Sequence, residues 1–203
     1  MSLKTAKVRF LVDIATDLFL CRSIQEVTIR DIAISAQVGE ATIYRYFGKK
    51  QQIVVEAAMK LQSIVTTEFF DMSNKNTGFQ QLEAFYMSYL DIFKKRPEFY
   101  KFLNEFDGYM AGENSDILNP YESAIDGFKT VFMNAYQLGI KDGSIKKQEN
   151  IDMFYFSTTH ALLELCKKLS AKAVLSQDTV IEKEKEISYL IGLILKSLNS
   201  LRV

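Results

Sequence analysis

Residues 28 to 50 carry the side chains of this chain that could bind nucleic acid. Arg30 could donate two hydrogen bonds to guanine, Glu40 could accept one from cytosine, and Ala41 could contact a thymine methyl group. Hydroxyl, phenol and ammonium groups bind phosphates, and such contacts fix the register of a protein on a duplex. The candidates for phosphate contacts are Thr28, Thr42, Tyr44, Tyr46 and Lys50, and Gly39, Arg45 and Lys49 complete the predicted DNA-binding set. The alternatives are packing for the two tyrosines and a solvated or intradomain charge for Arg45.

Two short helices joined by a tight turn are predicted to position these side chains. Thr28 and Asp31 have the spacing of a capping box, which starts a helix. The pattern breaks at residues 37–39, and Gly39 can cap a second helix that ends near Phe47. Val38, Ile43 and Phe47 would face inward, while the candidate contacts face out. Two such helices at a steep angle form the helix-turn-helix that docks in the major groove.

The segment as a whole resembles the N-terminal domain of the TetR family of bacterial transcriptional regulators. The resemblance rests on Ile14-Ala15, Leu18-Phe19, residues 28–33, Ala36, Val38, residues 41–47 and Lys50. It implies an all-helical homodimer with an N-terminal DNA-binding domain and a variable C-terminal domain that binds an effector and dimerises. Two positions depart from the family pattern. Gln37 stands where the family usually has glycine, so a left-handed conformation there would cost on the order of 1 kcal/mol, and Gly39 replaces the usual serine cap.

The predicted fold is all-α, with an N-terminal three-helix helix-turn-helix domain over residues 1–49 and a larger helical ligand-binding and dimerisation domain over residues 50–203. Two prolines, nine glycines and few alternating apolar runs favour helix. Apolar spacing and polar breaks predict helices over 3–20, 50–72, 79–95, from Pro97, 121–141, 150–173 and 178–201, with a polar loop over 108–120.

The net charge is zero, because 25 Lys and Arg balance 25 Asp and Glu. The distribution is uneven. Residues 1–55 hold eight basic and five acidic side chains, and the remainder holds 17 and 20. This modest basic excess lies where a duplex would bind, and a dimer would double the phosphate contacts.

Other functional classes find little support in the sequence. No apolar run is long enough for a membrane span and no leader is evident, so we expect a cytoplasmic protein without membrane contact. Cys21 and Cys166 are expected to be buried free thiols. No phosphate loop, nucleophile motif or metal-ligand spacing appears, so no metal, no cofactor and no enzymatic activity are predicted.

Aromatic residues between positions 69 and 136 suggest a place for a small-molecule effector. Most are expected to be core, but some could line an apolar pocket. The candidate ligand-binding residues are Phe69, Phe85, Tyr89, Phe93, Phe102, Phe128, Phe132 and His160. For His160, a core or interface position is the first interpretation and a polar pocket group the second. The predicted effector is apolar or aromatic.

The two last predicted helices are apolar all around, which indicates burial on two sides. A dimer interface is the favoured interpretation, and a central helix within one subunit is the alternative. The candidate interface residues are Leu162, Cys166, Leu169, Ile187, Leu190, Ile191, Ile194 and Leu198. Two-fold pairing would place the reading helices about 34–36 Å apart, matching a palindromic double-stranded operator.

The sequence therefore predicts a ligand-responsive transcriptional regulator, a homodimer that represses and releases its operator when the effector binds. An activator is one alternative. A helical small-molecule-binding or catalytic protein that keeps the DNA-binding module as a relic is the other.

Overall fold

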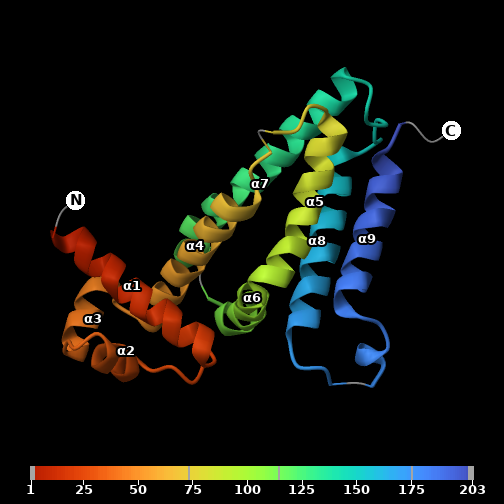
Figure 1. Ribbon diagram of the computed structural model, residues 1–203. Coiled ribbons are helices and arrows are strands. Elements are labelled where there is room, and N and C mark those ends of the chain that lie inside the picture. Colours follow the sequence, from red (N-terminus) through yellow and green to blue (C-terminus); the bar gives the residue numbers. More distant parts are fainter. Residues whose placement is uncertain (1–2, 73, 114, 175, 201–203) are drawn as a thin grey trace. The chain divides into compact units, whose positions relative to one another are not determined.

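The computed structural model describes residues 3–72, 74–113, 115–174 and 176–200, and Figure 1 shows that these residues are mainly helical. The helices are α1 (Leu3–Cys21), α2 (Ile29–Ser35), α3 (Glu40–Phe47), α4 (Lys50–Phe69), α5 (Gly78–Lys95), α6 (Pro97–Met110), α7 (Ser115–Lys141), α8 (Ile151–Ser170) and α9 (Lys183–Leu198), with a short 3-10 helix, η1 (Ser176–Thr179). The all-α prediction is confirmed.

The chain forms two compact units. Unit 1 comprises Met1–Ser63 and Lys101–Ala124, and unit 2 comprises Ile64–Tyr100 and Ile125–Val203. Helices α4, α6 and α7 each contribute residues to both units. The predicted boundary between residues 49 and 50 separates a DNA-binding domain from an effector-binding and dimerisation domain. This functional division remains a prediction.

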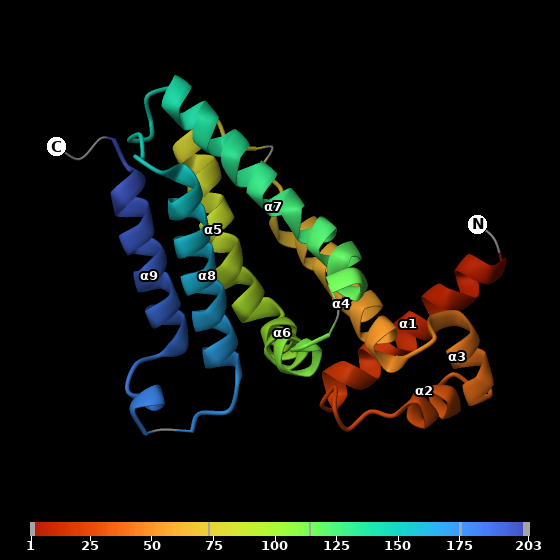
Figure 2. The ribbon, with the colours of Figure 1, turned by 180° about the vertical axis from the view of Figure 1, so that it is seen from behind.

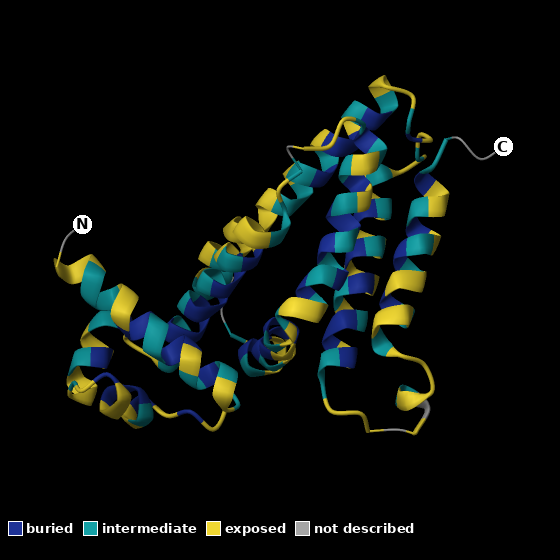
Figure 3. Cartoon of the chain, viewed as in Figure 1, coloured by how far each residue is buried: buried dark blue, intermediate teal, exposed yellow. Residues whose placement is uncertain are grey.

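Unit 1 is built around an apolar stripe on α1. Leu11, Ala15 and Phe19 recur every four residues and are buried, since this spacing places them on one helical face. Ile32 of α2 and Ile43 of α3 are fully buried as well. Figure 3 shows dark blue bands, which mark buried residues, on the helices of the N-terminal segment. The three N-terminal helices thus share one core, which fixes the orientation of α3.

Unit 2 contains three helices, α5, α8 and α9, that lie side by side in both ribbon views (Figures 1 and 2). Their facing sides bury Leu82 and Tyr86 of α5, Leu162 of α8, and Ile187 and Ile191 of α9. Helices α8 and α9 each keep another face exposed, which includes Phe156 of α8 and Tyr189 of α9.

A close backbone approach in unit 2 requires glycine. The Gly78 N–H donates to the Asp142 carboxylate over 2.8 Å, and a Cβ atom on Gly78 would lie only 2.0 Å from the backbone nitrogen of Gly139. Any side chain at residue 78 would therefore force α5 and α7 apart.

Several predicted boundaries are wrong. The predicted loop over 108–120 is mostly helical, because α6 continues to Met110 and α7 begins at Ser115. Pro120 lies inside α7 and is exposed, so its ring faces solvent and the helix loses one backbone hydrogen bond without ending. The helix from Lys50 ends at Phe69 and not at residue 72.

The C-terminal helix begins at Lys183, five residues after the predicted start. Asp178 lies instead in η1, where its carboxylate pairs with Lys168 at 3.1 Å. The predicted end at residue 201 lies outside the described residues. Among those described, no helix has both the length and the apolar character that crossing a lipid bilayer requires. Cys166 is buried as expected, whereas Cys21 is exposed at the end of α1, so the prediction for Cys21 is wrong.

Candidate nucleic-acid interface

Helix α2 begins with the predicted capping box. The Thr28 hydroxyl accepts from the Asp31 N–H at 3.1 Å, and the Asp31 carboxylate accepts from the Thr28 N–H at 2.8 Å. The Thr28 hydroxyl also donates to Asp31 at 2.7 Å. These bonds, with Arg22 at 3.5 Å, hold the pKa of Asp31 below its ordinary value; the bond from the Thr28 backbone is the largest cause. The Thr28 hydroxyl is thus engaged in the cap. The predicted phosphate contact would have to use the same hydroxyl group.

The turn between the two helices depends on Gln37. Its φ is 54°, which is the left-handed conformation that the sequence predicts for this residue. The Val38 N–H donates to the Ala33 carbonyl at 2.9 Å and the Gln37 N–H to the Ile34 carbonyl at 3.1 Å. This pair of bonds is a Schellman motif, which satisfies the last carbonyls of α2 although a residue other than glycine occupies the left-handed position.

Helix α3 separates a buried face from an exposed one. Ile43 and Phe47 are buried, as predicted, and Val38 before the helix is half-buried. Gly39 caps the helix without a side-chain hydrogen bond. The outward residues are Glu40, Ala41, Tyr44 and Arg45, which are exposed, and Thr42 and Tyr46, which are half-buried.

The exposed side of α3 makes few contacts of its own. In the described part of the chain, Glu40, Thr42 and Tyr44 have no side-chain hydrogen bond or ion pair, and Arg45 lies over the Tyr46 ring at 5.2 Å. Arg30, near the start of α2, is exposed and equally free of described partners. These groups are therefore available to an external ligand. The buried Ile43 and Phe47 fix α3 and thus the position of its exposed side chains.

Lys49 and Lys50 are less free than the sequence suggests. Lys49 pairs with Glu113 at 2.8 Å, and Gln51 donates to the same carboxylate at 3.1 Å. The Lys49 contact is the main cause of a lowered Glu113 pKa. Lys50 donates to the Ile24 carbonyl and lies 4.9 Å from the centre of the Tyr109 ring. Burial lowers the pKa of Lys50, although the charge of Asp31 opposes this.

The C-terminal part of α6 thus contacts the N-terminal segment of unit 1 over residues 3–50, which we call the head. The Ile24 N–H donates to Glu105 at 2.8 Å, and Tyr109 contacts Lys50. Sequence reasoning misses Glu105, Tyr109 and Glu113, because it predicts a loop from residue 108 and no spacing links these residues to positions 24, 49 and 50. The head has a fixed attachment to α6.

The predicted effector residues gather only in part. Phe70 of unit 2 contacts Phe85, Tyr89 and Phe128, with ring centres 5.5, 6.2 and 4.6 Å away, and Phe132 packs on Phe85 at 5.6 Å. Phe85 and Phe132 are fully buried, so they serve as core. Phe70 is not among the predicted ligand residues, although it lies beside Phe69 in the sequence.

The other predicted effector residues lie elsewhere. Phe102 belongs to unit 1 and stacks on Phe106 at 6.1 Å. Phe93 is half-buried beside Tyr100 at 6.4 Å, and Phe69 borders a polar groove at the start of α5. His160 is exposed, 5.6 Å from the Phe156 ring, so a core position is wrong, whereas an interface position remains a prediction.

Most predicted interface residues are already buried inside one chain. This applies to Leu162, Cys166, Leu169, Ile187, Ile191, Ile194 and Leu198, and Leu190 is half-buried. Burial raises the pKa of the Cys166 thiol to about 12. These side chains pack between α5, α8 and α9 and offer little surface to a second copy, which corrects their assignment. The apolar residues that α8 and α9 do expose are Met153, Phe156, Tyr189 and Leu193.

An all-α fold in which a capped two-helix unit presents a polar helix face defines a helix-turn-helix DNA-binding protein. Residues 11–57 match the family model for bacterial regulatory proteins of the tetR family. Over these residues the chain is similar to that family. Within the described residues, no group of three or more His, Cys, Asp or Glu side chains is placed to hold a metal ion.

Solved structures share the fold over nearly the whole chain. A tetR-family regulator from Agrobacterium tumefaciens has a TM-score of 0.72 and 10% identity, covering 97% of this chain and 99% of its own. A transcriptional regulator from Saccharomonospora viridis, solved with choline, has a TM-score of 0.70 and 18% identity, covering 96% and 98%. FadR from Bacillus subtilis, solved with stearoyl-CoA, has a TM-score of 0.70 and 15% identity, covering 93% and 98%. None of the curated proteins compared with this sequence matches it.

Proposed function

We propose that this protein is a transcriptional regulator that binds a palindromic double-stranded operator as a homodimer and releases it when a small apolar or aromatic effector binds. The observation that carries the proposal is the exposed face of α3, where Glu40, Ala41 and Tyr44 stand free of described partners above a buried anchor of Ile43 and Phe47. A regulator of bacterial genes acts in the cytoplasm, where we place it. The proposal involves no catalytic step.

In this proposal the contacts divide by chemistry. Arg30, Glu40 and Ala41 contact base edges, since their groups match guanine, cytosine and the thymine methyl. Thr42, Tyr44 and Arg45 contact phosphates. Thr28, Gly39 and Tyr46 complete the surface, as do Lys49 and Lys50 once phosphate replaces their internal partners.

The effector would bind at the aromatic cluster of unit 2. Tyr89 is half-buried, burial raises its pKa, and its hydroxyl makes no hydrogen bond with the described residues. By contrast, the Tyr86 hydroxyl is bonded to Thr158 at 2.7 Å, and that of Tyr100 donates to the Tyr89 carbonyl at 3.0 Å. A ligand with a ring and one polar atom could therefore pack beside Phe70 and Phe128 and bond to Tyr89.

Release would follow from different effector affinities in two arrangements of the dimer. Helix α6 begins in unit 2, and its C-terminal part holds Ile24 and Lys50 in unit 1. A shift of α6 on effector binding would move contacts on the head. The same element would thus serve the effector site and the DNA-binding surface.

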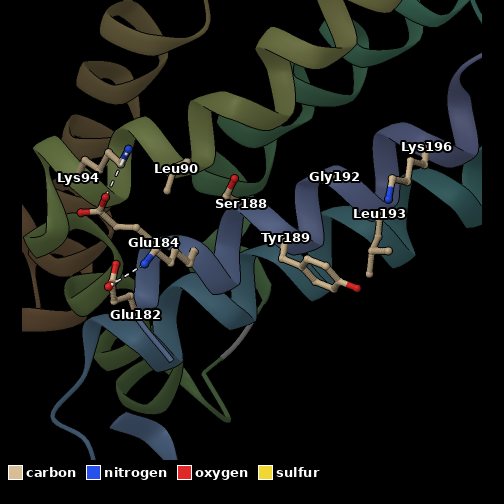
Figure 4. A pocket seen from close by; sticks show the side chains of 10 residues that line it. Leu90, Lys94, Glu182, Glu184, Ser188, Tyr189, Gly192, Leu193 and Lys196 are labelled. Carbon is tan, nitrogen blue, oxygen red and sulfur yellow. Dashed lines mark hydrogen bonds and ion pairs between the residues drawn. The ribbon is translucent and has the colours of Figure 1, made fainter. Parts of the chain in front are cut away.

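The apolar residues on the exposed faces of α8 and α9 support a homodimer. Tyr189 and Leu193 are 70% and 46% exposed, which is unusual for large apolar side chains that recur at helical spacing. They border a groove of about 550 Å³ between α5 and α9, edged by the Lys94–Glu184 ion pair at 3.4 Å (Figure 4). Side chains of a second copy would fill this groove and cover the apolar stripe.

Selection of bound duplexes from a random pool tests the proposal. We expect an enriched palindrome with half-sites about one helical turn apart, bound by the full chain in a gel shift.

A panel of apolar and aromatic compounds should contain members that raise the melting temperature and weaken operator binding. Tyr89→Phe should blunt that response, whereas Tyr189→Phe should leave it intact. Failure to enrich any sequence would refute the proposed function, and stronger operator binding with the effector would refute release.

A further inference from the structure

A basic groove runs between α1 and α3 in unit 1. Leu3, Lys4, Lys7 and Phe10 line it from α1, and Arg45 and Tyr46 line it from α3. Its volume is about 900 Å³. Leu3 is 90% exposed and Phe10 43% exposed, so apolar surface lies open beside the cations.

Within the described residues, the cations of this groove have no carboxylate partner. Neither Lys4, Lys7 nor Arg45 forms an ion pair or a side-chain hydrogen bond with the described residues, and no acidic side chain lines the groove. Lys7 lies over the Phe10 ring at 5.5 Å and Arg45 over the Tyr46 ring at 5.2 Å. Cation–π contacts thus position the Lys7 ammonium and the Arg45 guanidinium. Their N–H groups form no hydrogen bond with the described residues.

The chemistry of such a groove fits a polyanion. Each unpaired cation that neutralises a phosphate of duplex DNA releases counterions, which supplies affinity without reading sequence. Two of the lining residues, Arg45 and Tyr46, also belong to α3, the helix that carries the proposed reading face. The groove is therefore continuous with that face, and this continuity favours the DNA backbone over other anionic surfaces.

We propose that this groove binds the phosphate backbone of the operator beside the major groove, with Lys4 and Lys7 as phosphate contacts that join Arg45. The inference rests on the proposed DNA-binding function and extends it to α1. It assigns to α1 a direct contact with DNA in addition to its packing within the head.

The test compares the full chain with the double variant Lys4→Gln/Lys7→Gln. Binding to the selected operator and to a random duplex of equal length is measured over a series of salt concentrations. We expect the slope of log K against log salt to fall by about 0.9 for each phosphate that the variant no longer neutralises, with equal reductions of affinity on both duplexes. Lys4→Arg/Lys7→Arg should keep the slope, and Lys146→Gln/Lys147→Gln, which removes two exposed lysines of unit 2, should also leave it unchanged.

The outcomes separate the two proposals. If the wild-type chain selects no operator, the proposed function fails. If it binds its operator but the Lys4→Gln/Lys7→Gln variant keeps the wild-type slope and melting temperature, the groove does not contact phosphates and only this inference is overturned. Vesicles containing phosphatidylglycerol serve as the second probe. Lysine-dependent binding to vesicles together with an unchanged slope on DNA would assign the groove to a membrane surface and overturn it as well.

Discussion

Helices α3 and α9 both bury one face inside the chain and expose the other, but their exposed faces differ in chemistry. Helix α3 buries Ile43 and exposes polar groups such as Glu40, whereas α9 buries Ile191 and exposes Leu193 and Tyr189. The buried face of each helix establishes the fold of one chain. In the proposed function the exposed face meets the partner, which would be a charged duplex for α3 and the apolar face of a second copy for α9.

The largest effect should come from substituting one residue on the buried face of α9 and comparing it with a substitution on the exposed face. Ile191→Ala removes a fully buried side chain, so we expect the free energy of unfolding to fall by about 2–5 kcal/mol in denaturant titrations. Leu193→Ala, two residues along, should instead shift the protein toward monomer in sedimentation equilibrium and weaken dimerisation by about tenfold.

Both variants are compared at one protein concentration, because dimerisation adds to apparent stability. A folded Ile191→Ala chain that dissociates while Leu193→Ala remains a wild-type dimer would reverse the assignment of the two faces.

This contrast also explains which features can be predicted from sequence. The DNA-binding head follows local rules. Thr28 and Asp31 are three residues apart, Gln37 occupies the left-handed position of the turn between α2 and α3, and the apolar positions of α3 are few. The capping box, the turn and the buried face of α3 can therefore be predicted from neighbouring residues alone.

The apolar helices require tertiary information. Helix α9 has apolar residues on two faces, and periodicity cannot tell which face meets α5 and α8, so it assigns Ile187 and Ile191 to an interface although they are core. The contact of Glu113 with Lys49 spans 64 positions, and no local pattern encodes such a distance. Proline usually ends a helix, so Pro120 makes the sequence indicate a loop where α7 in fact begins at Ser115.

Arg30 provides the next largest effect and tests the polar face. Arg30→Ala should relax the preference for one base pair by about 1–3 kcal/mol, because a bidentate pair of hydrogen bonds reads one position only. Selection from the random pool, repeated with the variant, measures this change. Lys50→Ala is the comparison, and it should weaken operator and random DNA alike while also loosening the loop at Ile24, whose carbonyl Lys50 holds. Equal reductions on both duplexes for Arg30→Ala would remove its assignment to a base.

A smaller effect is expected where the head meets α6. Glu113→Gln should free Lys49 from its ion pair at 2.8 Å and strengthen binding to operator and random DNA by roughly two- to fivefold, since exposed ion pairs are weak. The salt dependence of binding should become steeper. Glu122→Gln removes an exposed carboxylate of unit 1 that has no described partner and should change neither quantity. Matching effects of the two variants would mean that overall charge acts, and not the release of Lys49.

The smallest effect concerns the start of α2 and depends on pH. The folded chain holds the pKa of Asp31 below its ordinary value of 3.8, first through the Thr28 backbone N–H and then through the Thr28 hydroxyl and Arg22. A carboxyl with a lowered folded pKa stabilises the fold fully above its unfolded pKa and loses that contribution as the pH falls through the folded value. The free energy of unfolding of the wild type should therefore exceed that of Asp31→Asn at neutral pH. The gap should begin to narrow as the pH falls below about 3.8 and should close once the pH is below the lowered folded pKa. Because the Thr28 bonds are the larger cause, Arg22→Gln should narrow the gap only slightly. A gap that stays constant from neutral to acidic pH would show that the charge of Asp31 contributes nothing to the cap, and the rigid presentation of α3 would then depend on its buried face alone.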